Sequence, residues 1–264
     1  MAGSMVYRTR VADLSAPAMK RFVEGMNKLQ PILDNRGFNA VAGYHGAPGW
    51  YCWHHQRASW SPRRAVLFLP WHRAYLWHLE QALQDQMAGV ALPWWDWTVQ
   101  RDVPDAYAQP TLSDGAHNPL HNFRARAPAT ADNPAIDHVT TRAPGRNPRG
   151  RLATSQEIAD LLKNEKDFAA FSDKLQDFHD RVHVWVGGDM GTVATAAFDP
   201  IFYAHHCMID RIWYLWQLEH GDPKFPQELL DLPLQPFAKT VKDTFDVHDL
   251  GYEYALSATP IEIS

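Results

Sequence analysis

The 264-residue sequence predicts a mainly α-helical protein in which a four-helix bundle forms the core, with long irregular loops and little β structure. Three observations support this prediction. Apolar residues recur at helical spacing in several successive segments, and Pro or Gly residues mark the ends of those segments. Hydrophobic residues make up 45% of the chain, which is enough to bury a sizeable core. No linker divides the sequence, so we expect a single domain over residues 1–264.

The first two helices are expected in the N-terminal third of the chain. One should begin near Pro17, with Asp13 or Ser15 as its N-cap. Its apolar stripe consists of Phe22, Met26, Leu29 and Leu33. A second helix should begin at Pro70 in the segment FLPWHRAYLWHLEQAL, because apolar residues repeat there at helical spacing.

A long irregular segment separates these helices from the rest. Residues 98–151 carry seven prolines and little periodicity, which is typical of functional loops or lids. Its arginines are expected to form a solvated surface: Arg142, Arg146, Arg149 and Arg151. Helical periodicity returns over 155–164 and 167–186, and a last long helix follows, with Asp199 as N-cap and Gly221 beyond its end.

The composition excludes several kinds of partner. A net charge of −5 and a pI near 6.2 argue against nucleic acid. The sequence contains no apolar run of the roughly 18 residues that a membrane span needs. The leading MAGS is expected to be a cloning remnant, and the following residues lack the apolar stretch of a secretory signal. We therefore expect a cytoplasmic protein, or one exported by a signal that is not present in this chain.

Histidines provide the strongest functional signal. His179 and His183 are four residues apart in a predicted helix, so both imidazoles lie on one face and can reach one metal. Two unrelated helical histidines would explain this pair equally well. His205 and His206, however, lie in a second helix among apolar neighbours, and buried imidazoles need partners. The pattern lacks the Glu-x-x-His pairs of di-iron sites and favours copper or zinc.

A parallel set of histidines occurs in the N-terminal half. His72 begins a predicted helix, and His45 and His54 precede it in an aromatic loop. Two sets of three histidines on two helix pairs predict a dinuclear centre inside the bundle. The remaining histidines are expected to be surface or loop residues: His78, His117, His121, His138, His220 and His248.

Several ordered motifs resemble one family. FLPWHRAYL and FDPIFYAHHCMIDRIW, with HDRVHVWVGG between them, resemble the two copper-binding signatures of tyrosinases, catechol oxidases and molluscan haemocyanins. VYRTRVADLS resembles the N-terminal arginine region of the family, and GYEYA resembles its closing tyrosine motif. We expect the short form of the family, without the C-terminal shielding domain of many fungal and plant relatives.

The resemblance implies a ligand set for two copper ions. The first would be bound by His45, His54 and His72, and the second by His179, His183 and His206. Because QRASWSPRR is inserted before FLPWH, His55 stays an alternative to His54. Cys52-Trp53-His54 resembles the Cys-x-His of fungal and molluscan relatives, in which the cysteine sulfur bonds covalently to the imidazole. The resemblance therefore implies a thioether between Cys52 and His54. A buried thiol, or a disulfide between Cys52 and Cys207, is the alternative.

The resemblance also implies a reaction. Family enzymes use O2 to ortho-hydroxylate monophenols and to oxidise o-diphenols to o-quinones. A catechol or o-aminophenol oxidase without monophenol activity is the alternative, followed by a haemocyanin-like oxygen carrier. Asp180 and Gln176 are expected to orient a water for phenol deprotonation. Phe202, Val193 and His205 are expected near the substrate, with His205 beside the metal but not bound to it. A copper-loading helper protein is a possible partner, and the chain could form a homo-oligomer.

Overall fold

The computed structural model describes residues 5–52, 62–131 and 133–255. His54, His55 and the proposed Cys52–His54 crosslink therefore lie outside the described residues. Within the described parts of the chain, no helix is both long enough and apolar enough to cross a membrane.

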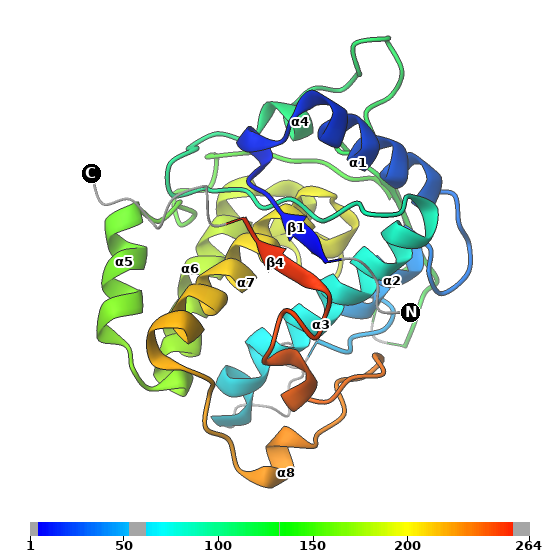
Figure 1. Cartoon of the computed structure of the whole chain (residues 1–264). Coiled ribbons are helices and arrows are strands. Elements are labelled where there is room, and N and C mark those ends of the chain that lie inside the picture. The colour runs from blue at the N-terminus through cyan, green and yellow to red at the C-terminus, as the bar shows by residue number, and fades with distance from the viewer. Residues whose placement is uncertain (1–4, 53–61, 132, 256–264) are drawn as a thin grey trace.

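Four helices form the core, which confirms the predicted mainly α-helical bundle. They are α2 (Phe38–His45), α3 (Pro62–Gln86), α6 (Phe168–Val186) and α7 (Ile201–His220). The loop predicted around His45 was wrong at its start, because His45 is the last residue of a helix. Figure 1 shows α3, α6 and α7 running through the centre of the molecule, with α5 along the outer side of α6. Nearly every described side chain of α7 from Ile201 to Trp216 is buried, because other elements cover this helix all around.

Further helices and 3-10 turns of the described chain surround this bundle. Its other α-helices are α1 (Ala16–Leu29), α4 (Asp105–Ala108), α5 (Ser155–Asn164) and α8 (Gln227–Leu230). Single 3-10 turns are η1 (Val11–Asp13), η3 (Gly188–Gly191), η4 (Ala196–Phe198) and η5 (Lys242–Thr244). Two of these turns, η3 and η4, connect α6 to α7, so they lie between the two helices that carry the C-terminal histidines.

The described β structure consists of two small sheets. β1 (Val6–Arg8) pairs in parallel with β4 (Tyr252–Tyr254), with Val6 opposite Tyr252. These strands lie side by side in front of the bundle (Figure 1). β2 (Arg124–Ala127) and β3 (Ile136–Val139) form an antiparallel hairpin within the long loop region.

A buried ionic cluster ties the β1–β4 sheet to the bundle. The carboxylate of Asp210 on α7 accepts from Arg73 at 2.5 Å and from Arg8 at 3.0 Å. The hydroxyls of Tyr252 and Tyr254 donate to the same carboxylate, at 2.7 and 2.5 Å. Burial by itself raises the pKa of Asp210, but the charges of Arg73 and Arg8 outweigh burial and lower it. The segments VYRTR and GYEYA therefore meet at one buried carboxylate.

Helix ends differ from the sequence predictions at two places. The helix predicted to begin at Pro70 starts earlier, at Pro62, and Pro70 lies inside α3. The stripe of the first helix ends at Leu29, and Leu33 is 91% exposed. Ser15 caps α1 by accepting from the Ala18 N–H, which decides between the two predicted caps. The apolar spacing continues past the end of α1 into the following turn, so spacing alone predicts too long a stripe.

The long loop region packs more tightly than predicted. Arg142 is not solvated: its guanidinium forms an ion pair with buried Asp199 and also donates to the carbonyls of Tyr107 and Leu120. Asp199 in turn accepts from the backbone N–H of Ile201, the first residue of α7. The prediction of a solvated arginine surface was wrong for Arg142, and it is confirmed for the exposed side chains of Arg146, Arg149 and Arg151.

Candidate metal centre

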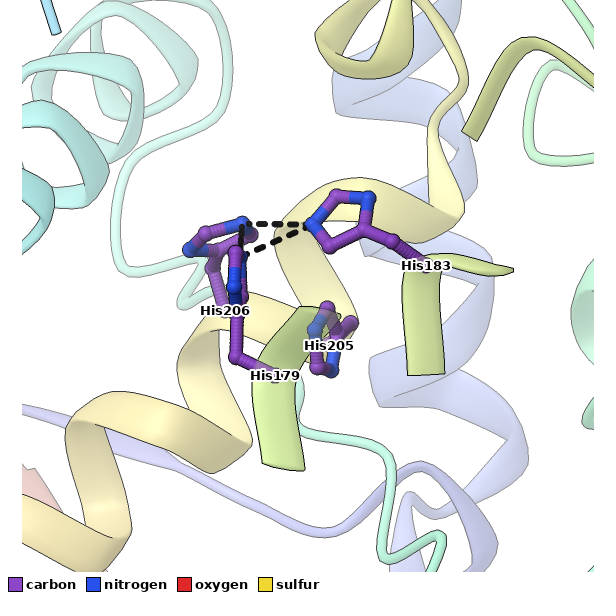
Figure 2. Close-up of side chains that lie close together, drawn as sticks. All are labelled: His179, His183, His205 and His206. Atoms are coloured by element: carbon purple, nitrogen blue, oxygen red, sulfur yellow. Dashed lines mark hydrogen bonds between the residues drawn. The ribbon is translucent and has the colours of Figure 1, made fainter. Parts of the chain in front are cut away.

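Three imidazoles from α6 and α7 converge on one point. The Nε2 atom of His179 lies 2.9 Å from that of His183 and 3.1 Å from that of His206. The third separation, between His183 and His206, is 3.3 Å. Figure 2 shows the three rings pointing their nitrogens toward one another from two separate helices. Because residues four apart share a helix face, α6 brings His179 and His183 together locally, whereas α7 must pack beside α6 to add His206.

The opposite ring nitrogens determine which tautomers are present. Nδ1 of His183 donates to the backbone carbonyl of Met190 in η3, at 2.8 Å. Nδ1 of His179 donates to the carboxylate of Asp180, at 2.9 Å. A neutral imidazole carries one proton, so both rings keep a lone pair on Nε2. Burial lowers the pKa of His183 and of His206, which keeps these rings neutral.

This arrangement fits a bound metal ion. Three nitrogens without a cation between them would bring lone pairs together at about 3 Å, which is repulsive. A tetrahedral metal with nitrogen ligands at about 2.0 Å holds those nitrogens about 3.3 Å apart. Three neutral imidazoles suit copper or zinc rather than calcium or magnesium, which prefer oxygen ligands.

A second group of possible ligands lies next to the first. His45 at the end of α2, Cys52 and His72 on α3 are all buried and have ligand atoms within 4.8 Å of one another. Nδ1 of His72 donates to the carbonyl of Phe68 at 2.8 Å, which leaves its Nε2 lone pair facing inward. Burial lowers the pKa of His72 to about 3, so this ring is neutral. The predicted His45 and His72 are thus brought together.

Cys52 lies directly in this group. Its sulfur is 3.7 Å from Nε2 of His72. Cys207 is also buried, and no disulfide joins these two cysteines, both of which the structure describes. The alternative of a Cys52–Cys207 disulfide was therefore wrong. Sequence reasoning paired Cys52 with its near neighbour His54 and missed its proximity to His72, twenty residues further along the chain.

The two groups of possible ligands are in direct contact through one stacked pair of rings. The rings of His72 and His206 stack with centroids 4.4 Å apart and planes at 17°. The ring of His45 lies 6.2 Å from that of His206. Phe202 also stacks on His206, with ring centroids 3.9 Å apart. The arrangement therefore suits two metal ions held side by side.

The remaining predicted site residues surround these groups in different ways. Asp180 is 58% exposed at its side chain and contacts His179 through its carboxylate. Gln176 is buried, and its amide donates to the carbonyl of Ser172 at 3.4 Å. Val193 is 38% exposed and lies in the segment between η3 and η4. The backbone carbonyl of Val193 would be only 2.4 Å from a Cβ atom at Gly46, so this segment packs directly after His45.

Sequence reasoning missed two neighbours of the centre. The carbonyl of Met190 orients His183, but a backbone group leaves no signal in a sequence. Trp97 donates from Nε1 to Nδ1 of His205 at 3.1 Å. The segment LPWWDW, just before the long loop, indicated buried aromatic residues, but nothing in it pointed to this contact.

Comparisons with known proteins agree with this geometry. The family described as the common central domain of tyrosinase matches residues 35–219. The chain is 31% identical to a tyrosinase of Streptomyces antibioticus over 244 residues, which cover 84% of this chain and 87% of that protein. It is 27% identical over 286 residues to the G-type hemocyanin of Enteroctopus dofleini, covering 96% of this chain but only 9% of that much longer protein.

The fold comparison leads to the same family. The structure of a tyrosinase from Burkholderia thailandensis matches with a TM-score of 0.79 and 23% identity, covering 97% of this chain and 75% of that one. At this identity the match supports the fold. Together with the sequence matches, it shows that the chain belongs to the tyrosinase family of type 3 copper proteins, whose members bind two copper ions.

Proposed function

We propose that this protein is a dicopper phenol oxidase that uses O2 to ortho-hydroxylate monophenols and to oxidise o-diphenols to o-quinones. One copper would be bound by His45, His72 and a histidine outside the described residues, for which His54 is our candidate. The other would be bound by His179, His183 and His206. Copper, when bound, supplies the one-electron redox chemistry that the reaction with O2 requires.

The chain's own residues supply ligands, orientation and an apolar surrounding. The described ligand candidates are almost fully buried: His45, His72, His179, His183 and His206. Hydrogen bonds at Nδ1 hold His72, His179 and His183 in tautomers that present Nε2. All-imidazole ligation adds no ligand charge, and three ligands for the second copper leave a coordination position open, as catalytic sites require.

We propose activity on monophenols because of the position of Asp180. Its carboxylate is more than half exposed, yet it contacts Nδ1 of a ligand candidate, His179, at 2.9 Å. A carboxylate at the boundary between solvent and the metal centre can accept the proton that a phenol must lose. A catechol oxidase has less need of such a base, because catechols ionise more readily.

Two further residues would border the substrate. Val193 is partly exposed, and its segment packs after His45. Phe202 stacks on His206 and limits how that imidazole can tilt. Val193 and the adjoining Ala194 have small side chains, which would leave room for a bulky phenol with a substituted ring.

An oxygen carrier is the second candidate, because hemocyanins are among the most similar relatives. Turnover separates the candidates. Purified protein should be loaded with copper, its copper content measured, and oxidation of tyramine and 4-methylcatechol followed by quinone absorbance. Two coppers and turnover of both compounds would support the proposal. Turnover of 4-methylcatechol alone would identify a catechol oxidase, and reversible O2 binding without turnover of either would identify a carrier.

A matched pair of variants tests the role of the base. Asp180→Asn should lower monophenol kcat by roughly 10²-fold or more, the usual contribution of a general base. Asp177→Asn, which changes an exposed residue on the same helix, is the control and should leave monophenol kcat unchanged. Full monophenol turnover by Asp180→Asn would exclude the carboxylate as the base.

A further inference from the structure

His205 presents a question that the ligand assignment leaves open. It is fully buried on α7, and its ring lies parallel to that of His179 at 5.2 Å and 15°. It also contacts His183 edge-on at 5.0 Å. A ring nitrogen of His205 is within 4.8 Å of ligand atoms of His179, His183 and His206 (Figure 2). Four imidazoles are therefore close enough to hold one metal, while the proposed site uses three.

The contact with Trp97 distinguishes His205 from its neighbours. An indole N–H can only donate, so the bond from Trp97 Nε1 to His205 Nδ1 requires a lone pair on Nδ1. The single proton of the neutral ring must then be on Nε2. His183 has the opposite tautomer, since its Nδ1 donates to a carbonyl.

Trp97 is itself held firmly against α7. Its side chain is fully buried, and its backbone N–H donates to the carbonyl of Trp95 at 3.0 Å. The backbone N–H of Trp95 donates to the carbonyl of Ala204, the residue before His205, also at 3.0 Å. This backbone bond fixes the segment beside α7 so that the Trp97 indole meets the His205 ring. The arrangement is therefore built from both main-chain and side-chain contacts.

We propose that Trp97 is a positioning residue: it holds His205 in the tautomer with its proton on Nε2 and so withholds a fourth nitrogen ligand from the second metal. A protonated nitrogen has no lone pair to donate to a metal. Four imidazoles would fill a tetrahedral site, whereas three leave a position for a reactant. The inference rests on the proposed assignment of His179, His183 and His206 as ligands.

The tautomer can be tested in copper-free protein, independently of any activity. Ring ¹⁵N shifts of histidine-labelled protein should show His205 with an unprotonated Nδ1 and a protonated Nε2, and His183 with the reverse. Trp97→Phe should move the His205 shifts toward the other tautomer. Trp95→Phe is the matched control, because it removes a buried indole that donates to a carbonyl, that of Gln100, from the same segment. A protonated Nδ1 on wild-type His205, or equal shifts in both variants, would overturn the proposal.

Metal binding gives a second test, in which the sign of the effect is decisive. If Trp97→Phe frees His205 to bind, transfer of copper from the loaded protein to a chelator should slow by about tenfold, a usual size for changes around metal ligands. X-ray absorption should then show more nitrogen neighbours per copper. In a His205→Asn background, Trp97→Phe should not slow release. Faster release from Trp97→Phe, as loosened packing would cause, or slowing that persists without His205, would overturn the proposal.

Discussion

His72 and His206 stack with ring centroids 4.4 Å apart, although 134 residues separate them in the chain and they belong to different helices, α3 and α7. Each ring belongs to a different group of possible ligands. The stacked pair therefore connects the two groups, and a change in one ring should affect both metals.

Replacing His206 should therefore weaken the binding of both copper ions, not only of the one that it would ligate. We expect copper-loaded His206→Asn to contain one copper per chain or fewer, against two in the unchanged protein. His220→Asn is the control, since His220 lies on the same helix but donates to the carbonyl of Leu162. Copper content measured by atomic absorption after dialysis tests this. Two tightly bound coppers in His206→Asn would remove that residue from the ligand set.

Gly46 should be sensitive to a single methyl group. A Cβ atom there would lie 2.4 Å from the carbonyl oxygen of Val193 and 2.7 Å from that of Ala194, so the backbone must move. Gly46→Ala should cost about 1–3 kcal/mol of unfolding free energy and change KM for bulky phenols. Gly191 lies in the connection that carries Val193 and Ala194, and a Cβ atom there would meet nothing within 4 Å, so Gly191→Ala serves as the control. An unchanged KM and melting temperature in Gly46→Ala would contradict this contact.

Asp210 should be essential for stability. Asp210→Asn leaves the buried guanidinium of Arg73 without its ion-pair partner, which should lower the free energy of unfolding by about 3–5 kcal/mol. Asp13→Asn breaks the exposed pair with Arg10 and should change it by less than about 1 kcal/mol. Urea denaturation of both variants measures the difference. Equal losses would mean that burial does not strengthen the Asp210 contacts.

Arg142 and Arg146 provide a matched comparison within the long loop. Arg142→Gln leaves the buried carboxylate of Asp199 without its cation at the start of α7, so a loss of about 3–5 kcal/mol is expected. Arg146→Gln changes an exposed side chain and should stay within about 0.5 kcal/mol. Thermal unfolding monitored by circular dichroism tests both. Similar melting temperatures for the two variants would restore the solvated interpretation of Arg142.

Copper-free protein should lose stability as the pH falls below about 6.5. Burial lowers the pKa of His72 to about 3, so the folded state keeps this ring neutral while the unfolded state binds a proton. The unfolded state is then favoured by up to about 1.4 kcal/mol per pH unit for this residue, in the window from 6.5 down to about 3. Urea denaturation at pH 7.5 and 5.5 measures the slope. His72→Asn should show a shallower slope, and equal slopes would contradict the assignment.

Much of the helical core could be predicted because helical signals are local. The pair His179 and His183 needs only the four-residue period of a helix. The cap at Ser15 and the glycine beyond the last helix act within one turn. Predictions failed where a local pattern was ambiguous: Pro70 is tolerated inside α3, and Leu33 continued a stripe after the chain had already turned. Short-range physics alone cannot locate such ends.

The bundle, the family and most of the histidines that could bind metal can be predicted from the amino-acid order, because helix periodicity and motif order are properties of consecutive residues. Three contacts become visible in the folded chain alone. Cys52 lies beside His72, Arg142 pairs with buried Asp199, and Trp97 donates to Nδ1 of His205. These contacts join segments far apart in the chain. They depend on how helices and loops pack, and packing is set by the whole core rather than by any local pattern.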